Sequence, residues 1–340
     1  MDRRGLLQGG GALIGTAAAA GCVRSAARRP ANDRQVTFLL NPAQIAYLPV
    51  FYALERGDFA AEGVDAVIKT YSGSANAQLP LLARGDVDVA GVIAAPALFN
   101  QAAAGFGIRL LCALTVPEAS HIDAVAIMVR QDIWRSGAVR RLQDLRGHSV
   151  DGAAEGNPID LLIRFALINA GLTPSEVRLS YKIRTPSDVV HLFQEKQVDV
   201  AGVSEPTATL ISERGLAHKW ISYRDVIPWY QDTFLGASED FVKSRPVAAA
   251  GVVRACLRAA GAINQARGAW TPATLAAAVK WSRFKPADLK AMGGVPYWSG
   301  DGAVDGRALD RVQQYWVGRR FVRTPTDVAA LLGPAQVAHV

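Results

Sequence analysis

The stretch VDVAGV occurs twice in this chain, at residues 87–92 and again at residues 198–203. Each copy is followed by a proline, Pro96 or Pro206, and nine residues after each proline comes a glycine, Gly105 or Gly215. A six-residue identity inside matching flanks indicates internal duplication. We therefore predict that the two copies are equivalent buried strands in two similar lobes, with a ligand cleft between the lobes.

The segments around each copy predict the same order of strands and helices. Short apolar runs of strand length alternate with helical segments that begin at prolines, which is typical of a parallel sheet covered by helices. The predicted strands are 36–40, 64–68, 87–92 and 108–114 in the first half and 148–151, 177–183 and 198–203 in the second. The predicted helices are 49–56, one ending near 84, 96–104, 158–171, 186–194 and 206–214. Pro80 predicts a kink or a late start in the second of these helices.

Two further segments are predicted to connect the lobes. The apolar run 124–130 carries the chain into the second lobe, and residues 229–235 bring it back. This places lobe one at 35–123 and 231–340, and lobe two at 124–230. The chain after residue 239 is predicted to be mostly helical and to pack on lobe one. The fold class is therefore α/β, with two lobes, a mostly parallel sheet in each and a helical C-terminal extension.

The N-terminus carries the features of an export signal. Arg3 and Arg4 precede two leucines, as in twin-arginine signals, and the apolar run 9–20 is too short to span a bilayer. Residues 19–22, AAGC, resemble a lipoprotein cleavage box in which Cys22 accepts the lipid, although Ala19 stands where Leu is usual. The alternative is cleavage by ordinary signal peptidase. Both predict an exported, periplasmic or outer-face protein, and residues 23–34 then form a tether.

Composition excludes several other classes of protein. The net charge is +7 over 340 residues, but the basic residues are scattered, so a nucleic-acid site is not indicated. Cys112 and Cys256 lie in apolar segments and are expected to be buried free thiols, with a disulfide as the alternative. No zinc spacing, phosphate-binding loop, dinucleotide motif or catalytic constellation is present. We therefore expect no cofactor, no metal and no catalytic residue.

In sheets of this kind, ligands bind beyond the carboxyl ends of the strands. Ser72 and Ser74 around Gly73 precede a helix and predict an anion site or a plain helix cap. Gly156 and Asn157 have the same two interpretations in lobe two. The candidate ligand-binding residues are Asn41, Gln44, Tyr47, Ser72, Gly73, Ser74, Ala95, Gly156, Asn157, Thr185, Glu205 and Trp229.

For some candidate residues the sequence allows either a ligand-binding role or a structural role. Glu205 either holds an amine or ring N–H of a ligand or caps the helix that follows it. Tyr47 and Trp229 could stack on a planar ligand, and packing at the hinge is the alternative for Trp229. Asp88 and Asp199, inside the two copies of VDVAGV, are expected to bond neighbouring backbone and not the ligand.

Several segments resemble one known family. PVFYALERGDFAAEGVD at 49–65, LLARGDVDVAGV at 81–92 and VDVAGVSEP at 198–206 are similar to substrate-binding proteins of ABC importers for nitrate, sulfonate, taurine and thiamine precursors, the NMT1-like family. LQDLRG at 142–147 and EDFVKSR at 239–245 extend the resemblance. It implies a type II periplasmic binding fold whose two lobes close on a ligand.

The resemblance also implies a function. The chain would be a monomeric, non-enzymatic solute-binding component that delivers its ligand to a membrane permease and its ATPase. Anion binders of the family use hydroxyls and backbone N–H groups of the first lobe, which Ser72 and Ser74 allow. Pyrimidine binders use aromatic stacking and carboxylates, which Tyr47, Trp229 and Glu205 allow. The alternative is an exported enzyme, such as a hydrolase, that uses the same cleft.

Overall fold

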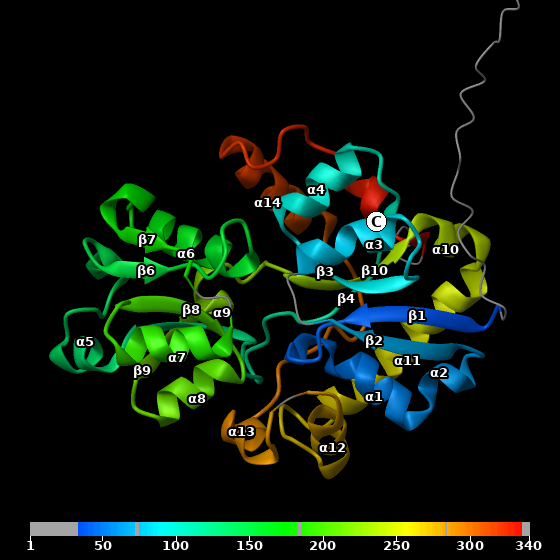
Figure 1. Cartoon of the computed structure of the whole chain (residues 1–340), viewed down its shortest axis with the longest axis horizontal. Helices are drawn as coiled ribbons and strands as arrows, with labels where there is room; N and C mark the ends of the chain where they lie inside the picture. The colour runs from blue at the N-terminus through cyan, green and yellow to red at the C-terminus, as the bar shows by residue number, and fades with distance from the viewer. Residues whose placement is uncertain (1–32, 72–74, 183–184, 283, 335–340) are drawn as a thin grey trace, which may run out of the picture.

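Two five-stranded sheets form the framework of the protein (Figure 1). The computed structural model describes residues 33–71, 75–182, 185–282 and 284–334. The export signal, Cys22, nearly all of the tether and the predicted Ser72–Gly73–Ser74 site lie outside the described residues. The first sheet has the strand order β2-β1-β3-β10-β4, and the second has β7-β6-β8-β5-β9.

The strands of the first sheet are β1 (Gln35–Leu40), β2 (Asp65–Thr70), β3 (Val89–Ile93), β4 (Ile108–Ala113) and β10 (Thr233–Ser238). Those of the second are β5 (Val125–Arg130), β6 (Ser149–Asp151), β7 (Arg178–Ser180), β8 (Val200–Ser204) and β9 (Ala217–Ser222). We call the part built on the first sheet lobe one and the part built on the second sheet lobe two. The two copies of VDVAGV supply β3 and β8, which occupy the same central position in their sheets.

Each sheet is mostly parallel, as predicted, but contains one strand of opposite direction. β10 pairs antiparallel with both β3 and β4, and β5 pairs antiparallel with both β8 and β9. Each of these two strands is the one by which the chain enters from the other lobe. The segment 229–235 therefore does bring the chain back, but its strand begins only at Thr233. The strand β9 was not predicted.

Most predicted helices are present, with bounds shifted by one or two residues. α1 (Leu48–Arg56) has Pro49 in its first turn and ends at Gly57, whose φ is 76°. The second predicted helix begins late: a 3-10 turn at Ala75–Gln78 precedes α3 (Leu79–Ala83), which has Pro80 in its first turn. The other helices of the two lobes are α2 (Asp58–Ala61), α4 (Pro96–Ala103), α5 (Gln131–Ser136), α6 (Pro158–Asn169), α7 (Pro186–Gln194), α8 (Thr207–Glu213) and α9 (Tyr223–Val226).

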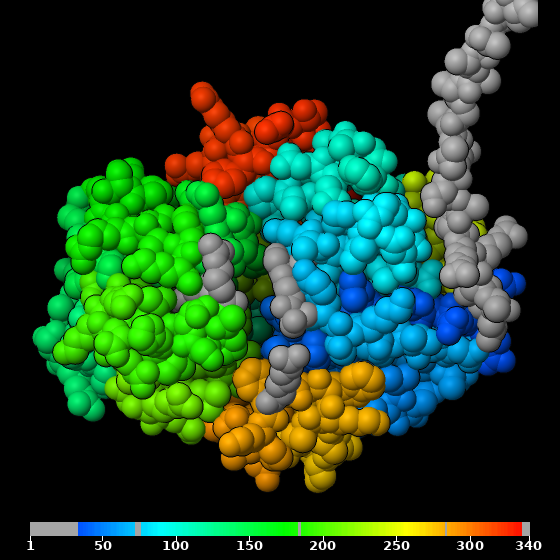
Figure 2. All heavy atoms as spheres, viewed as in Figure 1, coloured from blue at the N-terminus to red at the C-terminus, as the bar shows by residue number. Residues whose placement is uncertain are grey.

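The C-terminal extension consists of α10 (Glu239–Ser244), α11 (Pro246–Asn264), α12 (Pro272–Trp281), α13 (Pro286–Ala291) and α14 (Gly306–Gly318). The prediction that it packs on lobe one is incomplete. α11 does pack on α1 and α2, but α13 contacts α8 of lobe two. α14 contacts α4, and its Arg311 and Tyr315 lie against Trp229 at the return crossing and Phe165 of α6. In Figure 2 the orange and red residues of this extension adjoin both halves.

α11 is long and apolar enough to cross a membrane by length and composition, and half of its apolar window is buried inside the protein. Its buried side chains, among them Val252 and Ile263, belong to the core of lobe one. A second apolar cluster contains residues of both sheets together with Trp316 of α14. The interior is therefore continuous from one lobe to the other.

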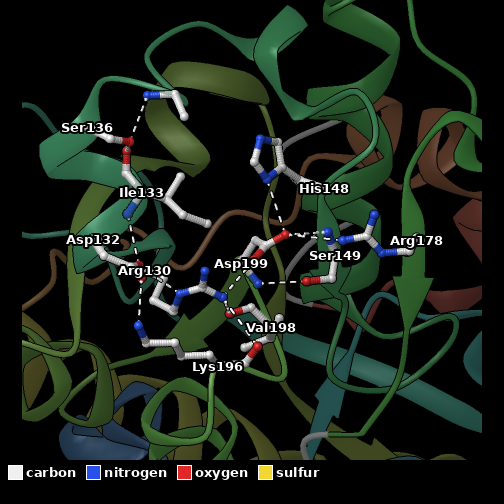
Figure 3. Close-up of polar contacts among 11 residues, drawn as sticks. Arg130, Asp132, Ile133, Ser136, His148, Ser149, Arg178, Lys196, Val198 and Asp199 are labelled. Carbon is white, nitrogen blue, oxygen red and sulfur yellow. Dashed lines mark hydrogen bonds and ion pairs between the residues drawn. The ribbon is translucent and has the colours of Figure 1, made fainter.

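The aspartates of the repeated stretch have equivalent structural roles. Asp88 accepts a hydrogen bond from the backbone N–H of Thr37 at 2.8 Å, and Asp199 accepts one from Ser149 at 2.9 Å. Each also pairs with an arginine, Arg245 for Asp88 and Arg130 for Asp199. Figure 3 shows Asp199 at the centre of its contacts. The expectation that these carboxylates bond neighbouring backbone is confirmed.

The glycines of the repeated stretch are also equivalent, because both allow a close approach. A Cβ at Gly91 would lie 2.1 Å from the hydroxyl oxygen of Tyr47, which precedes α1. A Cβ at Gly202 would lie 2.2 Å from Cγ2 of Ile159, in the first turn of α6. In each lobe the central strand thus lets the start of a helix at the cleft pack directly on its backbone.

Candidate ligand cleft

Figure 2 shows a groove between lobe two, in green, and lobe one, in blue and cyan. The loops after β3 and β6 contact each other where the lobes meet. Gly156 of lobe two has a φ of 78°, and a Cβ there would lie only 3.3 Å from Cγ of Pro96 in lobe one. Ala95, the N-terminal cap residue of α4, is fully buried beside this contact. The structure therefore brings the predicted residue Gly156 against Pro96, the neighbour of the predicted residue Ala95.

A buried polar cluster holds the lobe-two side of this contact in place. Asp160 is fully buried and accepts hydrogen bonds from the backbone N–H of Gly156 at 2.8 Å and the hydroxyl of Tyr181 at 3.0 Å. Arg164 donates to the same carboxylate at 2.9 Å. Burial raises the pKa of Asp160 in spite of these partners. Asn157 caps α6, since its side-chain oxygen accepts from the N–H of Asp160 at 2.7 Å.

A cavity lies between the loop after β1, the C-terminal extension and lobe two. Gln44 and Ile45 line it from lobe one, Phe284 and Leu289 from the extension, and Pro206 from lobe two. Gln44 is exposed, and its neighbour Asn41 accepts a hydrogen bond from the N–H of Ala43 at 3.0 Å. Pro206 lies in the loop that follows the second copy of VDVAGV, so this loop forms part of the cavity wall.

A second pocket lies where the chain crosses between the lobes. Thr115 and Asp232 line it from lobe one and Asp123 from just before the outward crossing, while Tyr223 follows β9 and Tyr230 lies in the return crossing. The hydroxyl of Thr115 donates to the carboxylate of Asp232 at 3.1 Å. Burial raises the pKa of Asp232, and the nearby hydroxyls of Thr233, Thr115 and Tyr223 oppose that effect. We call this the crossing pocket.

The remaining predicted residues have protein partners. Tyr47 is buried on Gly91, and burial together with the charge of Asp232 raises the pKa of its phenol. Thr185 is exposed and caps α7, accepting from the N–H of Asp188 at 3.3 Å. Trp229 lies between Arg311, 4.4 Å from its ring centre, and Phe165. This contact matches the hinge-packing alternative for Trp229.

Glu205 is buried and has two partners of its own. Its carboxylate accepts from the N–H of Thr209 at 3.1 Å, within the helix that follows it, and pairs with Lys219 at 2.5 Å. These contacts match the capping alternative, and Lys219 supplies the cation that a ligand amine would otherwise provide. Neither Lys219 nor its strand β9 was predicted.

Sequence reasoning did not select Asp232, Tyr223 or Thr115. Asp232 stands inside the predicted return crossing, so its place in the sequence was a usable signal. Thr115 and Tyr223 follow β4 and β9, at the carboxyl ends where ligands bind in such sheets. Because β9 was not predicted, the position of Tyr223 could not be inferred from the sequence. In the part of the chain that the structure describes, no group of three or more His, Cys, Asp or Glu residues could hold a metal ion.

The sequence matches one family model over most of this structure. The model described as "NMT1/THI5 like" matches residues 44–266, about two thirds of the chain, and covers both crossings and both copies of VDVAGV. The chain belongs to the NMT1/THI5-like family. A provisionally named binding protein of Brucella abortus (strain 2308) is 28% identical to this family member over 179 residues. The alignment spans 51% of the chain and 50% of that relative, so the chain spans about half the length of the curated relatives it matches.

Solved structures with the same fold include proteins with different ligands. The aliphatic sulphonate binding protein SsuA from Escherichia coli aligns with a TM-score of 0.71 and 16% identity, over 88% of this family member and 92% of SsuA. The nitrate-binding protein NrtA from Synechocystis PCC 6803 aligns with a TM-score of 0.72 and 14% identity, over 90% and 87%. DSZB, solved as a mutant in complex with biphenyl-2-sulfinic acid, aligns with a TM-score of 0.60 and 15% identity, over 90% and 98%. These likenesses establish the two-lobed periplasmic binding protein fold.

Proposed function

We propose that this protein is the solute-binding component of an ABC importer. It captures a small solute between its lobes and delivers it to a membrane permease. The observation that carries the proposal is the joining of two similar lobes by two crossings, with loops from both lobes meeting at one groove. Binding there stabilises the arrangement in which the lobes enclose the solute, because only that arrangement contacts it from both sides.

Two families of solute are compatible with the groove. A sulfonate- or nitrate-like anion would use helix N-termini such as those of α4 and α6, where backbone N–H groups carry partial positive charge. A pyrimidine-like solute would use carboxylates and aromatic rings. SsuA and NrtA, which share the fold, bind the first kind of solute.

An enzyme that uses the same cleft is the second candidate, and the chemistry of the cysteines does not favour it. Among the described residues the free cysteines are Cys112 and Cys256, and both are buried in the core of lobe one. Burial raises the pKa of the Cys112 thiol to about 12, so it is protonated and unreactive at neutral pH. A reaction at a cysteine thiol is therefore not supported. We propose, in keeping with the binding proteins that share the fold, that the solute is bound and released without being transformed.

The proposed location follows from the N-terminal sequence. Export by the signal at residues 1–22 and a lipid on Cys22 would hold a monomeric binding protein at the outer face of the membrane, near its permease. Replacing Cys22 by Ala tests this part alone. The expected result is release of the protein from the membrane fraction without loss of binding. Retention of Cys22→Ala in the membrane fraction would contradict lipid anchoring.

A thermal-shift screen tests the binding function. Alkanesulfonates, nitrate, pyrimidines, small amines and aromatic acids are each added to the purified protein. A true ligand stabilises the folded state by about 2.7 kcal/mol at a hundredfold excess over its Kd. Each hit is then incubated with the protein and recovered. Recovery of the hit unchanged supports a binding protein, and its chemical conversion would support the enzyme instead.

A further inference from the structure

The crossing pocket contains a carboxylate without a basic partner. Asp232 lies just before β10 and accepts a hydrogen bond from Thr115. Among the described residues, no lysine, arginine or histidine forms an ion pair with it. A carboxylate surrounded by protein is costly unless a cation or several hydrogen-bond donors compensate it.

The other acid of the pocket differs from Asp232 in this respect. Asp123 pairs with Arg224 at 3.4 Å and accepts from the hydroxyl of Ser222. The guanidinium of Arg224 also donates to the backbone oxygens of Ala119 and His121, at 3.0 and 2.8 Å. The guanidinium of Arg224 is therefore bonded to residues at the start of the outward crossing. The pocket has two carboxylates and one adjoining cation, so Asp232 is met by hydroxyl groups but by no positive charge.

A second observation points to a missing partner in the same pocket. Tyr223 is 4% exposed and lines the pocket. Its hydroxyl lies close enough to the carboxylate of Asp232 to lower the pKa of that carboxyl, but the two groups do not meet at full hydrogen-bond geometry. A buried hydroxyl that lacks a well-aligned partner destabilises the folded state, and a ligand group can supply that partner. The charge of Asp232 adds to burial in raising the pKa of this phenol, so the two groups lie near each other. The hydroxyl of Tyr230, in contrast, donates to the backbone oxygen of Ala94 at 3.2 Å.

We propose that the crossing pocket recognises a nitrogen group of the solute, a protonated amine or a ring or exocyclic N–H, through the carboxylate of Asp232 and the hydroxyl of Tyr223. The proposal rests on the proposed binding function and names the chemical class of the solute. The other titratable groups around Asp232 are Tyr47, Tyr230 and Asp123, and none of them supplies a positive charge. An N–H donor or cation would compensate Asp232, whereas a nitrate or sulfonate group at this position would repel it.

The test compares matched solutes that differ only in the nitrogen group. Taurine is compared with ethanesulfonate, 4-aminopyrimidine with pyrimidine, and nitrate serves as an anion without an N–H donor. Any further hit from the thermal-shift screen is paired in the same way. Affinities are measured by calorimetry for the full protein, for Asp232→Asn and for Tyr223→Phe. Glu213→Gln, an exposed change on α8, is the matched control, and circular dichroism checks that every variant is folded.

The expected result is binding of the nitrogen-bearing member of a pair and at least tenfold weaker binding of its partner. Asp232→Asn should lower affinity for that member by tenfold or more, Tyr223→Phe should lower it less, and Glu213→Gln should leave it unchanged. Hits without any N–H donor that bind Asp232→Asn as tightly as the unmodified protein would overturn the inference and leave the binding function intact. A screen across both classes that yields no hit would count against the binding function itself.

Discussion

At the scale of single residues, the structure explains why both copies of the repeated stretch contain a glycine. Gly91 and Gly202 allow Tyr47 and Ile159 to lie against the strand backbone, at distances where a methyl group does not fit. Forcing an extra carbon into a packed interior costs typically about 1–3 kcal/mol. We therefore expect Gly91→Ala and Gly202→Ala each to lower the free energy of unfolding by at least this amount.

Denaturant unfolding checks this prediction, with Gly261→Ala as the control. Gly261 lies inside α11, and a Cβ there would have no atom within 4 Å. Alanine is the better helix former by up to about 1 kcal/mol, so this change should be neutral or stabilising. Equal losses at all three glycines would contradict the close-approach explanation.

Asp199 predicts a specific dependence of stability on pH. Burial alone would raise its pKa, but hydrogen bonds from Ser149 and His148 hold the pKa below its ordinary value of 3.8. The ionised carboxylate therefore stabilises the folded state above about pH 4, and this contribution is lost as the pH falls through the folded pKa. Acid titration of the unfolding free energy should show a shallower fall for Asp199→Asn than for the unmodified protein. Parallel curves would contradict this assignment.

Asp232 predicts the opposite dependence of stability on pH. Its pKa is raised in the folded state, so its contribution to stability is present below its ordinary pKa and is lost as the pH rises through the folded value. In the absence of a solute, Asp232→Asn should raise the melting temperature at about pH 7 and give no advantage at about pH 3. The measurement is a thermal melt across this range, with Glu213→Gln as the control. A destabilised Asp232→Asn at neutral pH would show that the carboxylate is compensated by protein groups.

At the scale of elements, variants of Asn157, the cap of α6, can distinguish a structural role of this residue from a binding role. Asn157 accepts from the N–H of Asp160, and loss of such a cap costs roughly 1 kcal/mol. Asn157→Ala should lower stability by about this amount, and Asn157→Asp should restore it. Thr271→Ala, which removes a similar cap from α12, is the control. A loss of solute affinity in Asn157→Asp, with stability retained, would assign Asn157 to the binding site as well.

The sequence allowed most elements to be predicted, because their signals are local. Helix ends are marked by residues that act on the local backbone and do not depend on tertiary contacts. Examples are Pro49 with Gly57, Asn157 with Pro158, and Thr271 with Pro272. β9 was missed because its sequence, AHKWIS, mixes polar and apolar residues, as an edge strand does. The insertion of β10 between β3 and β4 depends on contacts more than 100 residues apart, which no local pattern reports.

The candidate site was predicted less completely than the fold. Gln44 lines a cavity, whereas Ala95 and Gly156 lie buried where the lobes meet, and their part in binding stays a prediction. Glu205 was a reasonable candidate, but its partner Lys219 lies on the strand that was missed. The crossing pocket depends on how the two connections between the lobes pack together, and only the three-dimensional structure places Asp232 beside Tyr223.

At the scale of the whole molecule, the C-terminal extension makes the two lobes one cooperative unit. One apolar cluster contains core residues of both lobes and Trp316, which is fully buried. Unfolding should therefore follow a single transition by fluorescence and by circular dichroism. Trp316→Ala should lower stability by about 3–5 kcal/mol, whereas Phe106→Ala, at a site 46% exposed, should have little effect. Two separate transitions in the unmodified protein would contradict a shared interior.

We propose that the protein holds a solute between its lobes and returns it unchanged. Equilibrium dialysis with the best hit of the screen, followed by mass spectrometry of the recovered solute, tests this most directly. The expected result is one solute bound per chain and complete recovery of the same compound after release. Recovery of a chemically altered compound would contradict it.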